Sequence, residues 1–231
     1  MTTIFTQDLE SVRDYYSRPR VVDGTSKTIY EIWESGDALG DSITPSTFCP
    51  DYQSHVTLKL QSLTTEGSTV FSVGCGNAVI EARLVQAGRR VRAIDYNREA
   101  VVLARNKGVD AFQADVMSLQ PNTLTDVSLV YADGLVGHLF DAELGLIPFL
   151  EKLATLGLPS GARLFISNDA PRDSDLSYEP HDRVEGFWFV SPSYLANALD
   201  QAGFKTIECY PFPYLRPKSG LRNRTLCVAK V

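Results

Sequence analysis

The chain has 231 residues, 44% of them hydrophobic, which is enough for one sizeable α/β domain with a buried core but hardly for two. Its net charge of -6 and isoelectric point near 5.1 argue against a broad surface for nucleic acid or anionic membrane. The four cysteines are scattered, so we predict neither a zinc site nor a disulfide framework. Without a signal-peptide or membrane-spanning pattern, we expect a cytoplasmic protein with no metal, nucleic-acid or membrane partner.

Residues 1–61 precede the first strand pattern and do not read as part of a sheet. We predict short helices over 8–16 and 26–34, a loop rich in Gly and Pro over 35–50, and a longer helix from Asp51 onward. The segment also has a high aromatic density, with Tyr15, Tyr16, Tyr30 and Trp33. These aromatic residues either pack the segment onto the sheet or cover a ligand.

The main domain begins with a buried strand, a tight turn, a helix and a second strand, in the order 69–73, Gly74-Cys75-Gly76, 78–87 and 91–94. We expect Asn77 to cap the helix and Gly88 to end it. The second strand ends on Asp95. Together these elements form the first half of a doubly wound nucleotide-binding sheet.

The glycine turn and the acid suit a nucleoside ligand. Glycines let the backbone approach a ligand where a Cβ would collide, and Asp95 can accept hydrogen bonds from both hydroxyls of a ribose. A dinucleotide fingerprint, G-x-G-x-x-G, would need glycine where the chain has Val79. An NAD(P)-dependent oxidoreductase is therefore the less favoured nucleotide-binding alternative.

The residues G-C-G-N-A at 74–78, followed by I-D-Y-N at 94–97, resemble motif I and the acidic strand end of class I S-adenosylmethionine (SAM) dependent methyltransferases. That family usually has the pattern D-x-G-x-G-x-G. This chain has Ser72 in place of the acid and Ala78 in place of the third glycine. A catalytically degenerate subunit that only binds is therefore a second alternative.

The resemblance implies a site for SAM and its product S-adenosylhomocysteine (SAH) at the strand ends. After a helix from Asn97, a third strand over 109–113 is followed by Asp115, where the family accepts the adenine amino group. A purely local turn role for this acid is the alternative. The cofactor-binding residues implied in this way are Gly74, Cys75, Gly76, Asp95, Tyr96, Asp115, Val116 and Ala132.

The fourth predicted strand, 125–131, exits into a loop over 132–140. In an open α/β sheet the ligand crevice lies where the strand order reverses, so this loop should face the transferred methyl group. His138 is the leading candidate for a catalytic base because its ordinary pKa lies near physiological pH; a structural hydrogen bond is the alternative. Asp133 is the second catalytic candidate, contacting the cofactor or orienting the acceptor.

The rest of the chain continues the alternation of helices and strands. We expect a helix over 141–156, a strand over 162–167, a polar insertion over 172–186, a helix over 191–202, and strands over 204–210 and 224–231. Prolines between the last two strands predict a loop and an antiparallel pair. Asn168 and Asp169 either orient an acceptor or form an Asx-type turn. Trp188, one of three adjacent aromatic residues, is expected to cover a flat acceptor.

The order of elements over 69–231 resembles the seven-stranded methyltransferase sheet. The resemblance implies an α/β Rossmann-like fold, a mostly parallel sheet with helices on both faces and an N-terminal helical lid. We assign 1–61 to the lid, whose Tyr16, Tyr30 and Trp33 would contact substrate, and 62–231 to the SAM-binding domain. The implied activity is methyl transfer to O or N of a small aromatic or heterocyclic secondary metabolite, by a monomer or homodimer.

Overall fold

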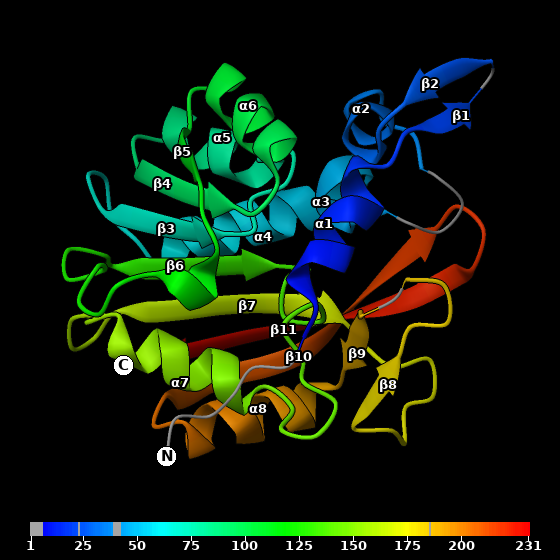
Figure 1. The fold of residues 1–231 in the computed structure, drawn as a ribbon. Helices are drawn as coiled ribbons and strands as arrows, with labels where there is room; N and C mark the ends of the chain where they lie inside the picture. Colours follow the sequence, from blue (N-terminus) through cyan, green and yellow to red (C-terminus); the bar gives the residue numbers. More distant parts are fainter. Residues whose placement is uncertain (1–6, 23, 39–42, 185) are drawn as a thin grey trace.

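The structure is a computed structural model that describes residues 7–22, 24–38, 43–184 and 186–231. Its centre is a seven-stranded sheet in the order β10-β11-β7-β6-β3-β4-β5, in which β11 runs antiparallel to the other six strands (Figure 1). The strands are β3 (Thr69–Val73), β4 (Arg90–Asp95), β5 (Asp110–Gln113), β6 (Leu129–Asp133), β7 (Arg163–Asp169), β10 (Lys205–Arg216) and β11 (Gly220–Lys230). The predicted mostly parallel, Rossmann-like sheet is confirmed.

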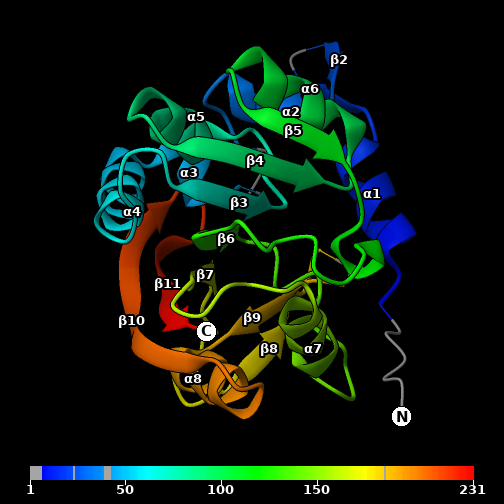
Figure 2. The ribbon, with the colours of Figure 1, turned by 90° about the vertical axis from the view of Figure 1, so that its left-hand side faces the viewer.

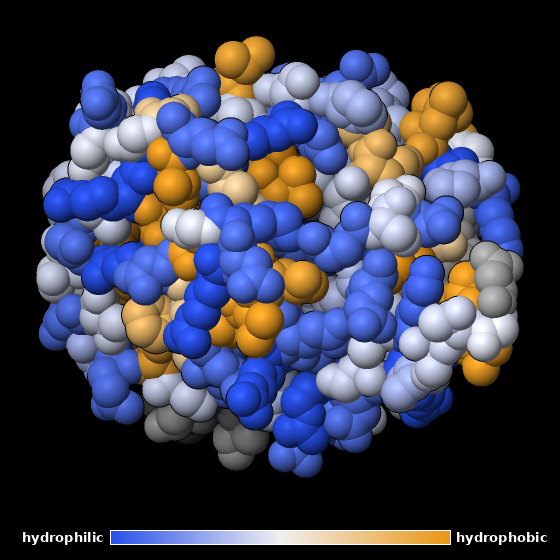
Figure 3. Space-filling model, turned by 90° about the horizontal axis from the view of Figure 1, so that it is seen from above, coloured by the Kyte–Doolittle hydropathy of each residue, from blue (hydrophilic) through white to orange (hydrophobic). Residues whose placement is uncertain are grey.

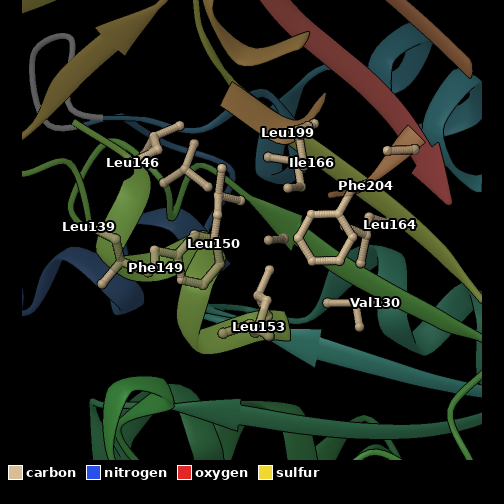
Figure 4. Close-up of a cluster of buried hydrophobic side chains, with 14 of the residues drawn as sticks. Val130, Leu139, Leu146, Phe149, Leu150, Leu153, Leu164, Ile166, Leu199 and Phe204 are labelled. Atoms are coloured by element: carbon tan, nitrogen blue, oxygen red, sulfur yellow. The ribbon is translucent and has the colours of Figure 1, made fainter. Parts of the chain in front are cut away.

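Helices cover both faces of this sheet, as predicted (Figure 2). They are α1 (Leu9–Ser17), α2 (Ile29–Glu34), α3 (Pro45–Phe48), α4 (Pro50–Ser62), α5 (Val79–Gln86), α6 (Arg98–Asn106), α7 (Ile147–Thr155) and α8 (Pro192–Gln201), with the 3-10 turn η1 (Val116–Ser118) after β5. Alternate side chains of β3 point to opposite faces, so Val70 packs with α4 and α5 while Phe71 packs with α7. Figure 4 shows the second of these two cores, where α7, α8, β6 and β7 meet.

The N-terminal elements divide between the sheet core and the strand ends. Helix α4 belongs to the core, because Tyr52, Val56 and Leu60 are fully buried with residues of β3 and α5. Helix α2 instead packs on α6, and Thr28 donates a hydrogen bond to Glu99. Among the described N-terminal elements, α1 to α3 and the short hairpin of β1 (Arg20–Val22) and β2 (Thr25–Lys27) therefore contribute no buried residue to the two cores of the sheet.

Several predicted boundaries were wrong because tertiary contacts decide them. The helix expected from Asp141 begins only at Ile147, after a tight Asp141–Gly145 turn. The expected loop before the last strand is instead part of the long β10–β11 hairpin, which tolerates Pro211 and Pro213 because β10 is an edge strand. The polar insertion contains a further hairpin, β8 (Tyr178–Pro180) with β9 (Trp188–Val190).

The predicted capping role of Asn77 was also wrong. Ala78 precedes the first turn of α5, and Asn77 instead uses its Nδ2 to donate to the Tyr30 carbonyl (3.2 Å) and to Glu34 (2.5 Å). Asn77 thus ties the glycine turn to α2. The predicted segments also include residues 1–6, 23, 39–42 and 185, which lie outside the described residues.

The visible surface mixes hydrophilic and hydrophobic side chains (Figure 3). On the face shown in Figure 3, hydrophilic side chains separate the hydrophobic ones into small groups. None of the helices in the described ranges has the length and apolar character needed to cross a membrane. Within the same ranges, His, Cys, Asp and Glu side chains form no cluster that could hold a metal ion.

Candidate functional site

A cavity lies at the carboxyl ends of β3, β4 and β6, and residues of α1, α2, α3, α5 and the segment after β5 also line it. Predicted cofactor residues from three separate segments meet there: Gly74, Cys75, Gly76, Asp95, Tyr96, Asp115 and Val116. Tyr16, Tyr30 and Trp33 line the same cavity from the N-terminal side, and His138 and Asp133 line it from the loop after β6. The structure therefore brings together most of the residues that the sequence analysis singled out.

The β3–α5 turn brings the main chain close to the cavity. Gly74 has a φ of 70°, and a Cβ there would lie 2.9 Å from the Leu135 side chain. Gly76 has a φ of 51°, and Ala78, two residues later, has a φ of 52°. Ala78 thus keeps the left-handed conformation that favours glycine, at the position where the methyltransferase motif has its third glycine.

Asp95 presents a buried carboxylate at the end of β4. Its Oδ2 accepts the Gly76 N–H (2.9 Å), and its Oδ1 accepts the Asn97 N–H (2.8 Å). Burial raises the pKa of Asp95 to about 6, against the opposing effect of these two donors. The two main-chain bonds fix the carboxylate against the glycine turn, and each oxygen keeps acceptor capacity for a ligand hydroxyl.

Asp115 also lines the cavity, but it is engaged in local structure. Its Oδ1 accepts the Met117 N–H (2.8 Å) and its Oδ2 accepts the Ser118 hydroxyl (2.9 Å), so it caps η1. The local turn that we weighed as the alternative is therefore present. Because ionised oxygens accept more than one hydrogen bond, the cap leaves room for a ligand donor, and the adenine contact stays a prediction.

His138 and Tyr16 form a buried pair in the cavity wall. The Tyr16 hydroxyl lies 2.7 Å from His138 Nε2, and the Phe187 ring packs edge-on against the imidazole. Burial lowers the pKa of His138 from 6.5 to about 3, which the nearby Gly186 backbone only partly opposes, and burial raises the pKa of Tyr16. His138 is thus a neutral imidazole, and in the tautomer protonated on Nδ1 its Nε2 accepts the Tyr16 hydrogen.

We expect the His138 imidazole to stay uncharged in the folded protein from pH 5 to pH 8, because this whole range lies above its folded-state pKa of about 3. Because the folded-state pKa is the lower one, His138 stabilises the fold fully above pH 6.5, and this contribution is lost as the pH falls toward 3. NMR titration of its Cε1–H signal tests this. A midpoint near the ordinary value would contradict it, and the exposed ring of a peptide histidine provides the reference.

Asp133 lines the cavity but belongs to a buried ion network. It pairs with Arg224 and accepts the hydroxyls of Tyr52 (2.9 Å) and Ser167 (2.7 Å). Arg224 also contacts Asp169 Oδ1 (3.1 Å), and the Arg224 side chain is almost fully buried. These bonds occupy one carboxylate oxygen of Asp133, so its proposed roles toward cofactor or acceptor remain predictions that only the other oxygen can serve.

The structure places three residues with predicted ligand contacts, Asn168, Trp188 and Ala132, outside the lining of the cavity. Strand β7 extends through Asn168, which is fully buried and bonds the Gly137 N–H (3.0 Å) and the Trp188 carbonyl (2.9 Å). Trp188 stacks on Phe140 with ring centroids 4.8 Å apart and does not line the cavity. Ala132 points into the sheet core, and its neighbours Asp133 and Gly134 face the cavity instead.

Asp169 lies in a smaller hollow beside the cavity. The two spaces share Tyr16, Trp33, Thr44 and Gly134 as lining residues. Asp169 is itself paired there with Arg216 and accepts the Tyr214 hydroxyl (2.7 Å). A contact between Asp169 and an acceptor stays a prediction, since its carboxylate is already in an ion pair.

Sequence reasoning missed two charged residues that the structure places at the site. Glu81 on α5 lines the cavity although it is buried, and Arg224 on β11 holds Asp133. The available signal was a charge inside an otherwise apolar pattern, A-V-I-E-A for Glu81 and R-T-L-C-V-A for Arg224. A buried charge is rare without a partner or a function, so a charge at these two positions indicates one or the other.

Comparison with solved structures shows that SAM-dependent methyltransferases share this fold. The 1,6-didemethyltoxoflavin-N1-methyltransferase of Burkholderia thailandensis, solved with 1,6-didemethyltoxoflavin and SAH, matches with a TM-score of 0.60 and 22% identity over 77% of each chain. A SAM-dependent methyltransferase of Methanosarcina mazei matches with a TM-score of 0.62 and 14% identity, over 74% of this chain and 96% of that one. At these identities the likeness concerns the fold.

The sequence comparisons identify a narrower family. No family model matches the chain. A protein described as a tabtoxin biosynthesis enzyme, from Pseudomonas amygdali pv. tabaci, is 58% identical over 225 residues, covering 97% of this chain and 89% of that protein. The chain belongs to the family of this tabtoxin biosynthesis enzyme. The [4+2]-cyclase SpnF also shares the fold, with a TM-score of 0.62 and 15% identity over 76% of this chain and 80% of that one, so fold alone does not define the reaction.

Proposed function

We propose that the chain is a SAM-dependent methyltransferase that acts on a small molecule of secondary metabolism. The observation that carries this proposal is the cavity at the strand ends, where the Gly74–Gly76 turn lies against the Asp95 carboxylate. In this assignment Asp95 accepts the ribose hydroxyls, Asp115 and Val116 hold the adenine, and the glycine turn faces the amino-acid part of the cofactor.

The charges of the cavity favour SAM over a dinucleotide. The described lining carries four acids, Glu81, Asp95, Asp115 and Asp133, and Arg13 is its one Arg or Lys. Arg224, which is not part of this lining, neutralises Asp133 from behind. A pyrophosphate would bring two further negative charges into this space, whereas SAM brings a positive sulfonium. This is the physical ground for preferring a methyltransferase to an NAD(P)-dependent oxidoreductase.

The bound cofactor supplies a methyl group that is already activated for displacement by its sulfonium charge. The task of the chain is then to align the acceptor and to exclude water. Tyr16, Tyr30 and Trp33 are packed on one another with ring centroids 5.7 to 5.9 Å apart, and they form a water-excluding wall. This wall also supports the proposal of a flat aromatic or heterocyclic acceptor, methylated on O or N.

The Tyr16–His138 pair is placed to take a proton from such an acceptor. The Tyr16 hydroxyl passes its hydrogen to His138 Nε2 while its oxygen takes the acceptor's hydrogen. The low pKa of His138 makes this a weak base, which suits an acceptor that loses its proton as the new bond forms. The relative's description as a tabtoxin biosynthesis enzyme supports the proposed place in secondary metabolism. We further propose that the protein is a cytoplasmic monomer or homodimer.

Calorimetric titration of the purified protein with SAM, SAH and NADH in parallel tests this proposal. We expect micromolar binding of both adenosyl ligands and no binding of NADH, because the acidic cavity repels a pyrophosphate. Binding of NADH alone would favour an oxidoreductase. Binding of none of the three would favour a degenerate subunit, the alternative that Ser72 and Ala78 raise.

A further inference from the structure

Strand β3 lacks the acid with which the methyltransferase motif D-x-G-x-G-x-G begins. At that position the chain has Ser72, whose hydroxyl donates to Glu81 Oε1 at 2.6 Å. Glu81 stands in the first turn of α5, on the other side of the glycine turn, and only 3% of its surface is exposed. The carboxylate of Glu81 on α5 therefore lies beside Ser72, the strand position that has no acid of its own. Glu81 also lines the cavity.

Glu81 has no cation to balance it. Among the described residues no Lys, Arg or His lies within ion-pair distance of Glu81. Burial raises the pKa of Glu81 to about 7, and the nearby charges of Asp133 and Asp95 add to the effect. An isolated buried carboxylate is costly, and a positively charged ligand group that bonds to it removes this cost.

Asn77, which lines the same cavity, provides an unsatisfied acceptor. Its side chain is 3% exposed and its Nδ2 is engaged with α2, but in the described part of the chain its Oδ1 accepts no hydrogen bond. A carboxylate without an ion-pair partner and an amide oxygen without a donor suit a primary ammonium group, which has three N–H donors and no acceptor.

We propose that Glu81 and Asn77 form the subsite for the ammonium group of the cofactor's amino-acid part, with Ser72 as the positioning residue for Glu81. Glu81 replaces, from the helix, the acid that the methyltransferase motif carries on its first strand. This inference rests on the proposed function, because it assumes an adenosyl amino acid in the cavity. Glu81 and Asn77 would hold the amino-acid part of the cofactor, which a plain nucleoside lacks.

Titration of wild type and Glu81→Gln with SAH and with 5′-methylthioadenosine tests the subsite. The second ligand keeps the adenosine and the thioether but has no amino-acid chain. We expect Glu81→Gln to weaken SAH binding about 10–100-fold, because a charge-assisted bond to the ammonium is lost. Binding of 5′-methylthioadenosine should change less than about twofold, and this ligand also reports whether the variant is folded. Glu143→Gln, at an exposed glutamate outside the cavity, is the matched control.

The double variant Ser72→Asp with Glu81→Gln supplies a rescue test. It returns the acid to the strand, so it should regain at least part of the lost SAH affinity. Equal SAH affinity of wild type and Glu81→Gln would overturn the subsite and leave the proposed function standing. Equal weakening of both ligands, or a double variant with no recovery, would also overturn it. A wild type that binds neither ligand would overturn the proposed function, and this inference with it.

Discussion

Replacing Arg224 with methionine is expected to lower the free energy of unfolding by about 3–5 kcal/mol, the usual cost of breaking a buried charge pair. The guanidinium pairs with Asp133, contacts Asp169 (3.1 Å) and donates to Ser167 Oγ (2.9 Å). Methionine fills much of the volume but leaves two carboxylates buried without this cation. Urea denaturation monitored by circular dichroism measures the loss.

The matched control for this variant is Arg222→Met on the same strand. The Arg222 side chain is half-buried, and the one hydrogen bond described for it is long, to the Ala170 carbonyl at 3.4 Å. We expect its substitution to cost less than about 1 kcal/mol. Equal losses for the two variants would contradict the view that the buried network around Arg224 holds β6, β7 and β11 together.

Replacing Asp95 with alanine is expected to weaken SAH binding about 10–100-fold, the effect of losing charge-assisted hydrogen bonds. The variant loses the proposed acceptor for the ribose hydroxyls. It also loses the bonds to the Gly76 and Asn97 N–H groups, which hold the glycine turn against β4. Calorimetric titration with SAH gives the affinity directly.

Asp110→Ala is the control for this second variant, because Asp110 is an exposed acid at the start of the neighbouring strand β5. Its SAH affinity should match that of the wild type. Unchanged affinity in Asp95→Ala would remove the ribose assignment. A thermal melt of both variants separates a loss of ligand contacts from a loss of folding, since Asp95 also bonds to the main chain.

The fold was predictable because its main signals are local. The buried strand at 69–73, the glycine turn and the acid that ends β4 lie within 27 consecutive residues (69–95), and the structure reproduces them closely. The site residues on this stretch were predictable for the same reason. Parallel strands place their carboxyl ends at one edge, so Gly76, Asp95 and Asp115 had to meet there.

The remaining parts depend on contacts between distant segments. Asp133 and Arg224 are 91 residues apart in the sequence, so no local sequence pattern predicts that they pair. The assignment of Asn168 failed because β7 continues beyond the predicted end and buries the side chain against Gly137 and Trp188. Glu81 went unnoticed because a single acid on an amphipathic helix is ordinarily solvated, and only the packing of α5 shows that it faces the cavity.

The most direct test of the central claim is a crystal structure of the protein with SAH. We predict SAH in the cavity at the carboxyl ends of β3 and β4, with the ribose hydroxyls on the Asp95 carboxylate and the amino group on Glu81. SAH bound elsewhere, or in the cavity with its ribose away from Asp95, would contradict the assignment of this cavity as the cofactor site of a methyltransferase.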